Sequence, residues 1–189
     1  MLQRRFRDGI ISICKSPKLE LRETKKYGLG VFADENIREG QTIHLLTGEA
    51  ISLAECIRRV KDGEETVDDP LQIEIELYLD LDYLSRAFNH SCDPSAGLRN
   101  RSELFALRNI RKGEEITYDY SATVGPNISA AMWQMPCCCS ATSCRKQIGN
   151  ILTLPPETLT RYQKLGALQD YIMLLLEKLE NNGSRTVKK

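Results

Sequence analysis

Four of the seven cysteines lie close together, and their spacing suits a metal centre better than disulfides. In the segment CCCSATSC, Cys137, Cys139 and Cys144 have the spacing C-x-C-x4-C. Neighbouring cysteines cannot easily pair with one another, and thiolates are soft ligands for zinc, which prefers a closed tetrahedron in structural sites. Three ligands leave one vertex, for which Cys92 and Cys138 are both candidates. The alternative is a group of unrelated surface thiols.

A second segment, RAFNHSCDPS, places Asn89, His90 and Cys92 almost side by side. Each of these residue types is common in ordinary roles. A lone histidine is usually a satisfied core or surface residue, and a lone cysteine behaves as a small hydrophobe. This segment alone therefore leaves a metal site, a catalytic group and simple packing all open.

Two tyrosines in EEITYDY have the spacing of neighbours on one face of a strand. Side chains two residues apart in a strand point to the same side, so Tyr118 and Tyr120 should share a face and Asp119 should point away. Tyrosine hydroxyls can orient a reacting group by hydrogen bonds. Without the neighbouring motifs, two tyrosines packing in a strand would be the default interpretation.

Short strands broken by turns must position these residues. Apolar residues alternate in short runs that glycines interrupt, and the segments VFADENIREGQTI and LFALRNIRKGEEI share one pattern, which we interpret as paired hairpins. After the cysteines the pattern becomes helical. Pro155 and Pro156 suit a first turn, Gly166 should divide two helices, and Asn182 with Gly183 should end the second.

The apolar stripe of the C-terminal helices has two interpretations. We favour packing onto the parent domain over homodimerisation. The stripe has spacings of three and four residues and consists of Leu165, Leu168, Ile172, Leu175 and Leu179.

Length and charge limit the class of protein. The 189 residues suffice for one compact domain with an appendage, and 26 basic residues balance 26 acidic ones, so no overall field attracts nucleic acid or an anionic membrane. No run of signal-peptide character or of about 18 apolar residues occurs. We therefore expect an intracellular, cytoplasmic protein that binds neither nucleic acid directly nor membranes; a nuclear location or export to a host stays open.

Five motifs, in order, resemble one family. KKYGLGVFA, TGEAIS, RAFNHSCDPS, FALRNIRKGEEITYDY and CCCSATSCRKQIG are similar to the motifs of SET-domain protein lysine methyltransferases that carry a post-SET zinc segment, from about Lys18 to Asn150. The resemblance implies a mainly β fold, the SET-domain β-clip with a pseudoknot, followed by the zinc segment and C-terminal α-helices. The implied regions are a SET domain at 18–125, a post-SET zinc segment at 133–152, a helical segment at 153–182 and a disordered tail at 183–189.

The resemblance also implies a role for each residue singled out above. Tyr120 matches the catalytic tyrosine, and Tyr118 matches the position that limits how many methyl groups fit. Cys92 would be the fourth zinc ligand beside Cys137, Cys139 and Cys144, leaving Cys138 over. S-adenosylmethionine would be bound by Tyr27, Gly28, Leu29, Gly30, Arg86, Asn89, His90 and Tyr120.

The implied activity is methyl transfer from S-adenosylmethionine to the ε-amine of a protein lysine, mainly a single methylation. One departure counts against it, because Leu46 stands where many members have a tyrosine two residues before Gly-Glu. A catalytically weak or silent SET module that binds a basic peptide is therefore the alternative. A zinc-stabilised structural or dimerisation protein is the third class.

The segment between TGEAIS and RAFNHSC is short and acidic. Residues 62–82 hold nine acidic side chains and no lysine, arginine or histidine. Such a run is often only a solvated face. The sharper interpretation is a negative rim that steers a Lys/Arg-rich substrate, such as a histone-like tail, toward the site.

Overall fold

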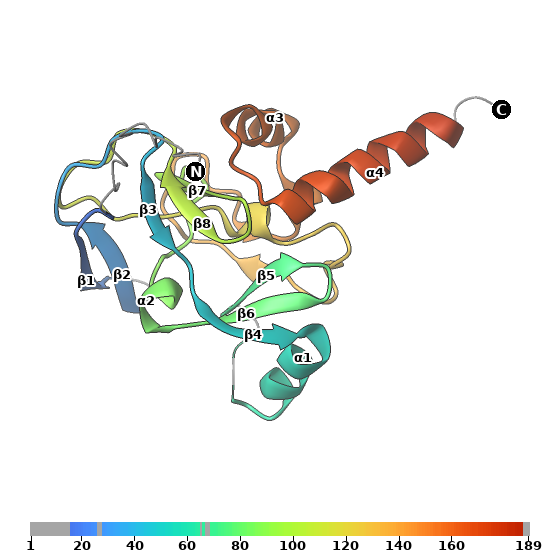
Figure 1. Ribbon diagram of the computed structural model, residues 1–189, viewed down its shortest axis with the longest axis horizontal. Helices are drawn as coiled ribbons and strands as arrows, with labels where there is room; N and C mark the ends of the chain where they lie inside the picture. The colour runs from blue at the N-terminus through green and yellow to red at the C-terminus, as the bar shows by residue number, and fades with distance from the viewer. Residues whose placement is uncertain (1–15, 26–27, 65, 67–68, 187–189) are drawn as a thin grey trace, which may run out of the picture.

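The structure is a computed structural model and describes residues 16–25, 28–64, 66 and 69–186. It is mainly β, as the sequence predicts, with short antiparallel sheets and with its two longest helices at the C-terminal end (Figure 1). Two sheets have three strands, in the orders β3-β8-β7 and β4-β6-β5, and two are pairs, β1-β2 and β9-β10. The strands are β1 (Leu19–Thr24), β2 (Gly28–Ala33), β3 (Thr42–Leu45), β4 (Gly48–Ser52), β5 (Pro70–Glu74), β6 (Leu77–Leu81), β7 (Ala96–Arg99), β8 (Glu103–Ala106), β9 (Met135–Pro136) and β10 (Gln147–Ile148). The helices are α1 (Leu53–Lys61), α2 (Tyr83–Arg86), α3 (Pro156–Leu165) and α4 (Asp170–Thr186), with 3-10 turns η1 (Tyr120–Thr123) and η2 (Ile151–Thr153).

The two segments of similar sequence pair with each other. The backbone N–H of Gly40 donates to the carbonyl of Ala106 at 2.8 Å. At the equivalent place in the other segment, the N–H of Gly113 donates to the carbonyl of Ala33 at 2.7 Å. Both glycines have left-handed φ values, 77° and 85°, which favour glycine at these turns. The shared pattern therefore reflects a reciprocal pairing of two equivalent turns within one fold.

Helix α1 follows β4 and lies at the end of the β4-β6-β5 sheet (Figure 1). Ser52 caps its N-terminus by accepting a hydrogen bond from the N–H of Glu55 at 3.2 Å. None of its residues is buried. An exposed helix with one apolar face, beside a sheet edge, is suited to form the wall of a cavity.

Helix α3 packs against the β domain through Tyr162 near its end, and α4 packs there through its first two turns. Pro156 occupies the first turn of α3, and Gly166 ends it with φ 62°, as the sequence predicts. Tyr162 and Ile172 are buried against the domain, whereas Leu179 is 47% exposed on the part of α4 that projects outward (Figure 1). Homodimerisation through this helix stays a prediction.

Helix α4 runs to Thr186, so the expected end at Asn182 and Gly183 is wrong, and residues 183–186 are helical rather than disordered. A single glycine weakens a helix by only about 1 kcal/mol and does not have to end it. No helix in the described part of the chain combines the length and apolar character that crossing a bilayer requires.

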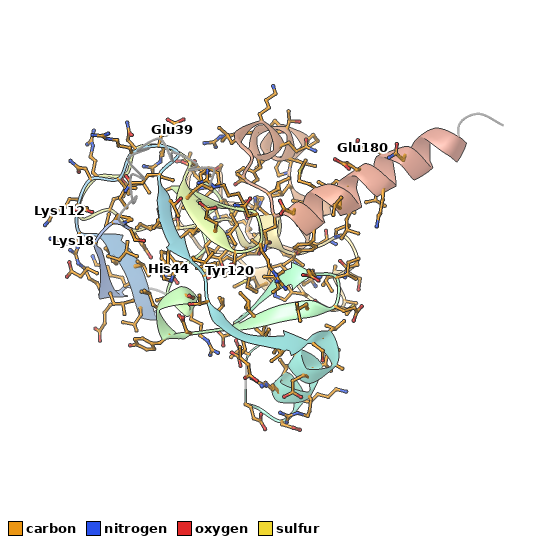
Figure 2. The ribbon with its side chains drawn as sticks, in the orientation of Figure 1. Lys18, Glu39, His44, Lys112, Tyr120 and Glu180 are labelled. Carbon is orange, nitrogen blue, oxygen red and sulfur yellow. The ribbon has the colours of Figure 1, made fainter. Side chains whose placement is uncertain are left out.

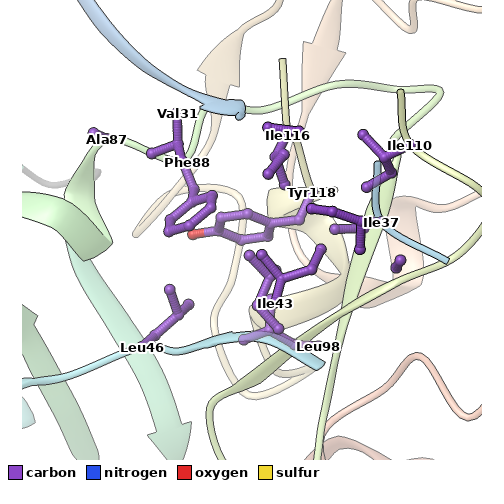
Figure 3. Close-up of a cluster of buried hydrophobic side chains, with 14 of the residues drawn as sticks. Val31, Ile37, Ile43, Leu46, Ala87, Phe88, Leu98, Ile110, Ile116 and Tyr118 are labelled. Carbon is purple, nitrogen blue, oxygen red and sulfur yellow. The ribbon is translucent and has the colours of Figure 1, made fainter. Parts of the chain in front are cut away.

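The main hydrophobic core lies between the sheets and includes one of the predicted site residues. Tyr118 is 5% exposed and belongs to the same buried cluster as Phe88 and Leu46 (Figure 3). Leu46 itself is 1% exposed. The segment with the two tyrosines is therefore anchored in the core at Tyr118.

Candidate functional site

The tyrosine segment is extended but is not a regular strand. It is held by isolated bridges, one of which pairs Tyr118 in parallel with His90. The chain then turns into η1, because the Asp119 side chain caps that turn by accepting from the N–H of Ser121 at 3.1 Å. The predicted strand through Tyr120 is therefore wrong. The predicted alternation of faces nevertheless describes Tyr118, Asp119 and Tyr120 correctly.

The two tyrosine rings contact each other at the centre of the molecule. Their centroids are 4.8 Å apart at an interplanar angle of 45°. The Tyr120 hydroxyl donates to the carbonyl oxygen of Phe88 at 2.9 Å. Burial raises the pKa of Tyr118, so its hydroxyl is neutral at physiological pH. In Figure 2, Tyr120 lies near the middle of the view, while Lys18 and Lys112 lie along its edge.

The segment with Asn89 and His90 runs parallel to the tyrosine segment. The N–H of Tyr118 donates to the carbonyl of Asn89, and the N–H of Ser91 donates to the carbonyl of Tyr118, both at 3.1 Å. The N–H of Tyr120 donates to Nδ1 of His90 at 3.2 Å. These bonds bring segments about thirty residues apart in the chain into one site.

Two cavities meet at the tyrosines. One, of about 290 Å³, is lined mostly by apolar side chains, among them Leu53 and Ile57 of α1 and Trp133. The other, of about 250 Å³, is lined by Arg86, Asn89, His90 and the Pro136–Cys138 stretch. Tyr118 and Tyr120 line both cavities. Two ligands bound in these cavities would approach each other beside the two tyrosines.

The cysteines converge beside the second cavity. Sγ of Cys92 is 3.8 Å from Sγ of Cys137, which in turn is 3.7 Å from Sγ of Cys144. Ligands about 2.3 Å from a tetrahedral zinc ion lie about 3.8 Å apart, so these distances match the edges of such a tetrahedron. Cys139 accepts from the N–H of Cys92 at 3.4 Å, and Cys138 is exposed. The donor set therefore fits zinc.

His90 is close enough to this cluster to be considered as a ligand. Its ring, Cys92, Cys137 and Cys139 offer ligand atoms that all lie within 4.8 Å of one another. However, Nδ1 of His90 accepts from a backbone N–H, and Asp119 Oδ1 lies 3.7 Å from it, beyond hydrogen-bond distance.

Burial lowers the pKa of His90 to about 4, so the ring is neutral and its proton is on Nε2. Nε2 lies 3.4 Å from Sγ of Cys92, where an N–H can donate to a thiolate. This tautomer makes His90 a hydrogen-bond donor to the cluster and favours Cys144 as the fourth ligand.

The predicted cofactor residues divide into two groups. Arg86, Asn89 and His90 line the second cavity, together with Tyr120. Among the described residues that line it, the glycine loop 28–30 is absent, and Tyr27 lies outside the described residues.

The glycine loop acts on the site through Asn89. The Asn89 amide donates to the carbonyl of Leu29 at 3.0 Å and to Oε1 of Glu115 at 2.8 Å. A Cβ on Gly30 would stand 2.7 Å from that same Oε1 and 3.1 Å from the Asn89 amide nitrogen. Packing inside the protein therefore favours a glycine at 30. Gly28 has φ 71°, which also favours glycine.

The acidic segment of residues 62–82, called the acidic insert below, is largely neutralised by arginines from outside it. Five of its seven described acidic residues pair with an arginine, and Asp80 contacts both Arg59 and Arg86. The prediction of a negative rim considered only residues 62–82, whereas the preceding helix α1 supplies Arg58 and Arg59. The other pairs are Arg58 with Asp62 and Glu64, Arg86 with Asp69, and Arg101 with Glu74.

Sequence reasoning missed two parts of the site. The apolar wall from α1 was treated only as part of a short insert, although Leu53, Ile57 and Val60 have the three-to-four spacing of a helix face. The buried partner of Asp119, which is Arg145, was also missed. An arginine directly after a predicted metal ligand and an aspartate between two predicted catalytic residues were the available signals.

Comparison with known proteins gives a consistent result. Residues 28–121 match the family model described as SET domain. The chain is 33% identical over 146 residues to "Putative histone-lysine N-methyltransferase ASHH4" of Arabidopsis thaliana. This alignment covers 70% of this chain and 40% of the relative. It is 34% identical over 120 residues to "Variant-silencing SET domain-containing protein" of Plasmodium falciparum, covering 54% of this chain and 5% of that protein.

A solved structure also matches, and its title reads "crystal structure of KRYPTONITE in complex with mCHG DNA and SAH". The TM-score is 0.55 at 25% identity, covering 69% of this chain and 29% of that one. This chain thus spans two fifths or less of the relatives named here.

Proposed function

Because this chain contains a SET domain, we propose that it transfers a methyl group from S-adenosylmethionine to the ε-amine of a lysine in a protein substrate. The observation that carries the proposal is the meeting of two cavities at Tyr118 and Tyr120. Lysine would enter through the apolar cavity, and the cofactor would occupy the cavity beside Asn89 and His90. Methyl transfer between two such ligands needs them to meet end to end, which this arrangement supports.

The apolar cavity suits the first requirement of the reaction, a neutral amine. A lysine ammonium has a pKa of about 10.4, so exposing its lone pair at pH 7 takes about 4.6 kcal/mol. Desolvation disfavours the charged form and lowers this pKa. Apart from Lys61 and Asp69, the side chains around this cavity are uncharged or weakly acidic. The proton can leave to water before transfer.

The tyrosines are suited to orient that amine. The Tyr120 O–H is donated to the Phe88 carbonyl at 2.9 Å, so the phenol oxygen keeps lone pairs with which it can accept an N–H of the substrate. Its backbone N–H is fixed by His90. A held acceptor beside the junction of the cavities aims the amine lone pair, which is the contribution expected of preorganised groups.

The cofactor, when bound, supplies an electrophilic methyl group on a positively charged sulfonium. Arg86, Asn89, His90 and Tyr120 would hold it, because they line the second cavity. Gly28, Leu29 and Gly30 would act through Asn89, whose amide they position. The volume of this cavity, about 250 Å³, and its mixed polar and apolar lining suit a small organic cofactor such as S-adenosylmethionine.

We further propose that the main product is monomethyl-lysine. Tyr118 is buried in the core at the junction of the two cavities, and its neutral hydroxyl fills space there. An amine that already carries a methyl group needs that space to turn its lone pair toward the sulfonium. The product is therefore limited by the phenol oxygen of Tyr118.

Zinc is proposed as a structural component. Cys92, Cys137, Cys139 and Cys144 would hold it, and the sulfur separations of 3.7 and 3.8 Å support this ligand set. The Lys146 backbone N–H lowers the pKa of Cys144 to about 7, which favours the thiolate that a metal requires. The ion would fix the Pro136–Cys138 side of the cofactor cavity.

The identity of the substrate stays a prediction. The relatives named as histone-lysine methyltransferases support a protein substrate. A Lys/Arg-rich sequence has less support than the acidic run suggested, because arginines pair with most of the described carboxylates. The cytoplasmic location and the lack of direct binding to nucleic acid or membranes also stay predictions.

The alternative, a silent module, is favoured by one observation. Leu46 is buried in the core at 1% exposure, so its position contributes no hydroxyl to the lysine. Tyr78, from strand β6, lines the apolar cavity and would offer a hydroxyl there instead. Because Tyr78 can supply the hydroxyl that position 46 lacks, we favour the active enzyme over the silent module.

One experiment separates the two functions. The full chain is incubated with labelled S-adenosylmethionine and whole-cell lysate, and methylated lysines are identified by mass spectrometry, while binding of S-adenosylhomocysteine is measured by calorimetry. The proposal predicts both cofactor binding and labelled lysine. Cofactor binding without any labelled lysine identifies the silent module. The absence of both cofactor binding and labelled lysine would contradict both functions.

A further inference from the structure

Asp119, which separates the two tyrosines, carries a fully bonded buried carboxylate. Its side chain is 1% exposed. Arg145 donates to it twice, from Nη1 to Oδ2 at 2.7 Å and from Nη2 to Oδ1 at 2.6 Å. The Tyr162 hydroxyl of α3 donates to Oδ2 at 3.1 Å, and the N–H of Ser121 donates to Oδ1 at 3.1 Å. Four donors satisfy the four lone-pair positions of a carboxylate.

Arg145 joins this carboxylate to the cysteine cluster. It follows Cys144 directly, and its backbone N–H lies 3.5 Å from Sγ of Cys92. Its guanidinium also donates to Oγ of Ser121 at 3.2 Å, and the side chain is only 13% exposed. The backbone of Arg145 thus belongs to the cysteine cluster, whereas its side chain belongs to the tyrosine segment.

We propose that the Asp119–Arg145 pair is a positioning element that sets the orientation of Tyr118 and Tyr120, and that Tyr162 completes it. The proposal rests on the proposed methyl transfer, in which these tyrosines orient the amine. Asp119 shares a peptide bond with each tyrosine, so any change in its backbone dihedral angles turns the two rings relative to each other. A two-bond fork between guanidinium and carboxylate is directional and resists that rotation.

The fork is better explained by positioning than by stability. Buried ion pairs contribute little net stability, because desolvation of both charges offsets their attraction, and removing both charges together is often tolerated. The two charges of the pair face one another inside the site, and His90, Tyr162 and Cys92 are titratable groups beside them. What the pair supplies is a fixed geometry between three elements: the cysteine segment, the tyrosine segment and α3.

The test removes both charges at once in the full chain. The double variant Asp119→Asn with Arg145→Met leaves no unpaired buried charge and keeps an oxygen to cap η1. Arg145→Lys keeps the charge but loses the fork. Arg99→Met is the matched control, because Arg99 makes a similar 2.7 Å ion pair with Glu103 in the β7–β8 hairpin. Each protein is tested for kcat and KM with one substrate peptide, zinc content, and amide hydrogen exchange.

We expect kcat of the double variant to fall at least about tenfold, with KM within about twofold. Exchange of the Tyr118 and Tyr120 amides should become at least about tenfold faster, while the zinc content stays as in the wild type. The kcat and exchange rates of Arg145→Lys should lie between those of the wild type and the double variant. Those of Arg99→Met should match the wild type. Unchanged kcat and exchange in the double variant, or zinc lost in parallel with activity, would overturn the proposal.

Two further results keep the outcome clear. If the wild type transfers no methyl group, the proposed function fails, yet hydrogen exchange at Tyr118 and Tyr120 still decides whether the pair positions them. If the double variant does not fold, Tyr162→Phe removes a single neutral bond to Asp119 and should lower kcat about two- to tenfold. Wild-type kcat and exchange in Tyr162→Phe would then overturn the proposal.

Discussion

Replacing Tyr120 with phenylalanine tests the central assignment most directly. The substitution removes the hydroxyl that donates to the Phe88 carbonyl at 2.9 Å. The ring keeps its contacts with the rings of His90 and Tyr118, whose centroids lie 5.4 and 4.8 Å from its own. Loss of one preorganised polar contact at a reacting centre lowers rates by about 10- to 1,000-fold, which corresponds to about 1.4–4 kcal/mol in the barrier.

The effect on folding should be much smaller than this. The Phe88 carbonyl loses one donor, for which the usual range is about 1–3 kcal/mol when nothing replaces it. Tyr120 lines both cavities, so water can reach that carbonyl and the lower end of the range applies. The variant should therefore be folded, bind the cofactor and be slow in every methyl transfer.

Tyr118→Phe is the matched comparison, because it removes the same atom from the adjacent ring. Tyr118 lies in the core at 5% exposure, so the phenylalanine ring should pack in its place. The first transfer should stay within about threefold of the wild type, because the proposal assigns orientation of the amine to Tyr120. The space vacated by the oxygen should admit dimethyl-lysine.

Mass spectrometry of one substrate peptide treated with the wild type and both variants gives rate and methylation state together. Circular dichroism and binding of S-adenosylhomocysteine confirm that each variant is folded. If Tyr120→Phe keeps the full rate, that residue does not orient the amine. If Tyr118→Phe gives only monomethyl-lysine, product restriction lies elsewhere in the cavity.

Three further predictions concern the metal, the substrate and the fold. Elemental analysis should find about one zinc ion per chain, and chelation should increase proteolysis within residues 133–150 before the β core unfolds; active protein without zinc would contradict the ligand set. The apparent KM for a basic peptide should rise no more than about twofold between about 0.05 and 0.3 M salt, because the insert's carboxylates are paired; a steep rise would restore the negative rim. Gly166→Ala should lower the free energy of unfolding by about 1 kcal/mol in a urea titration, because Gly166 has φ 62°, and an unchanged midpoint would show that the α3–α4 junction relaxes.

Local signals in the sequence predict a large part of this fold. Glycine and proline positions correctly place the break between α3 and α4, because left-handed and first-turn backbone geometries select those residues directly. The proximity of Asn89, Tyr118 and the cysteines follows from motif resemblance, and the geometry is compatible with it. The end of α4 is missed, since one glycine only weakens a helix that propagates through it.

The missed features depend on contacts between distant segments. The charge of residues 62–82 cannot be read from that segment alone, because Arg58 pairs with Asp62 from the preceding helix turn and Arg59 reaches Asp80 only after α1 has folded beside β6. The strand predicted through Tyr120 fails for a similar reason. Asp119 has the right spacing for a strand, but its bonds to Arg145, 26 residues later, and to Tyr162 hold a 3-10 turn there instead.

Leu46 shows how a departure from a motif can be absorbed by packing. Its side chain is buried in the same cluster as Tyr118, so it supports the ring from which product restriction is expected (Figure 3). A buried hydroxyl at that position would need a partner, and without one it would destabilise the core. Tyr78, itself 7% exposed, lines the apolar cavity from β6, and we expect the lysine amine to be the partner of its hydroxyl. A hydroxyl supplied from β6 would therefore allow the core to stay apolar beneath Tyr118 and Tyr120.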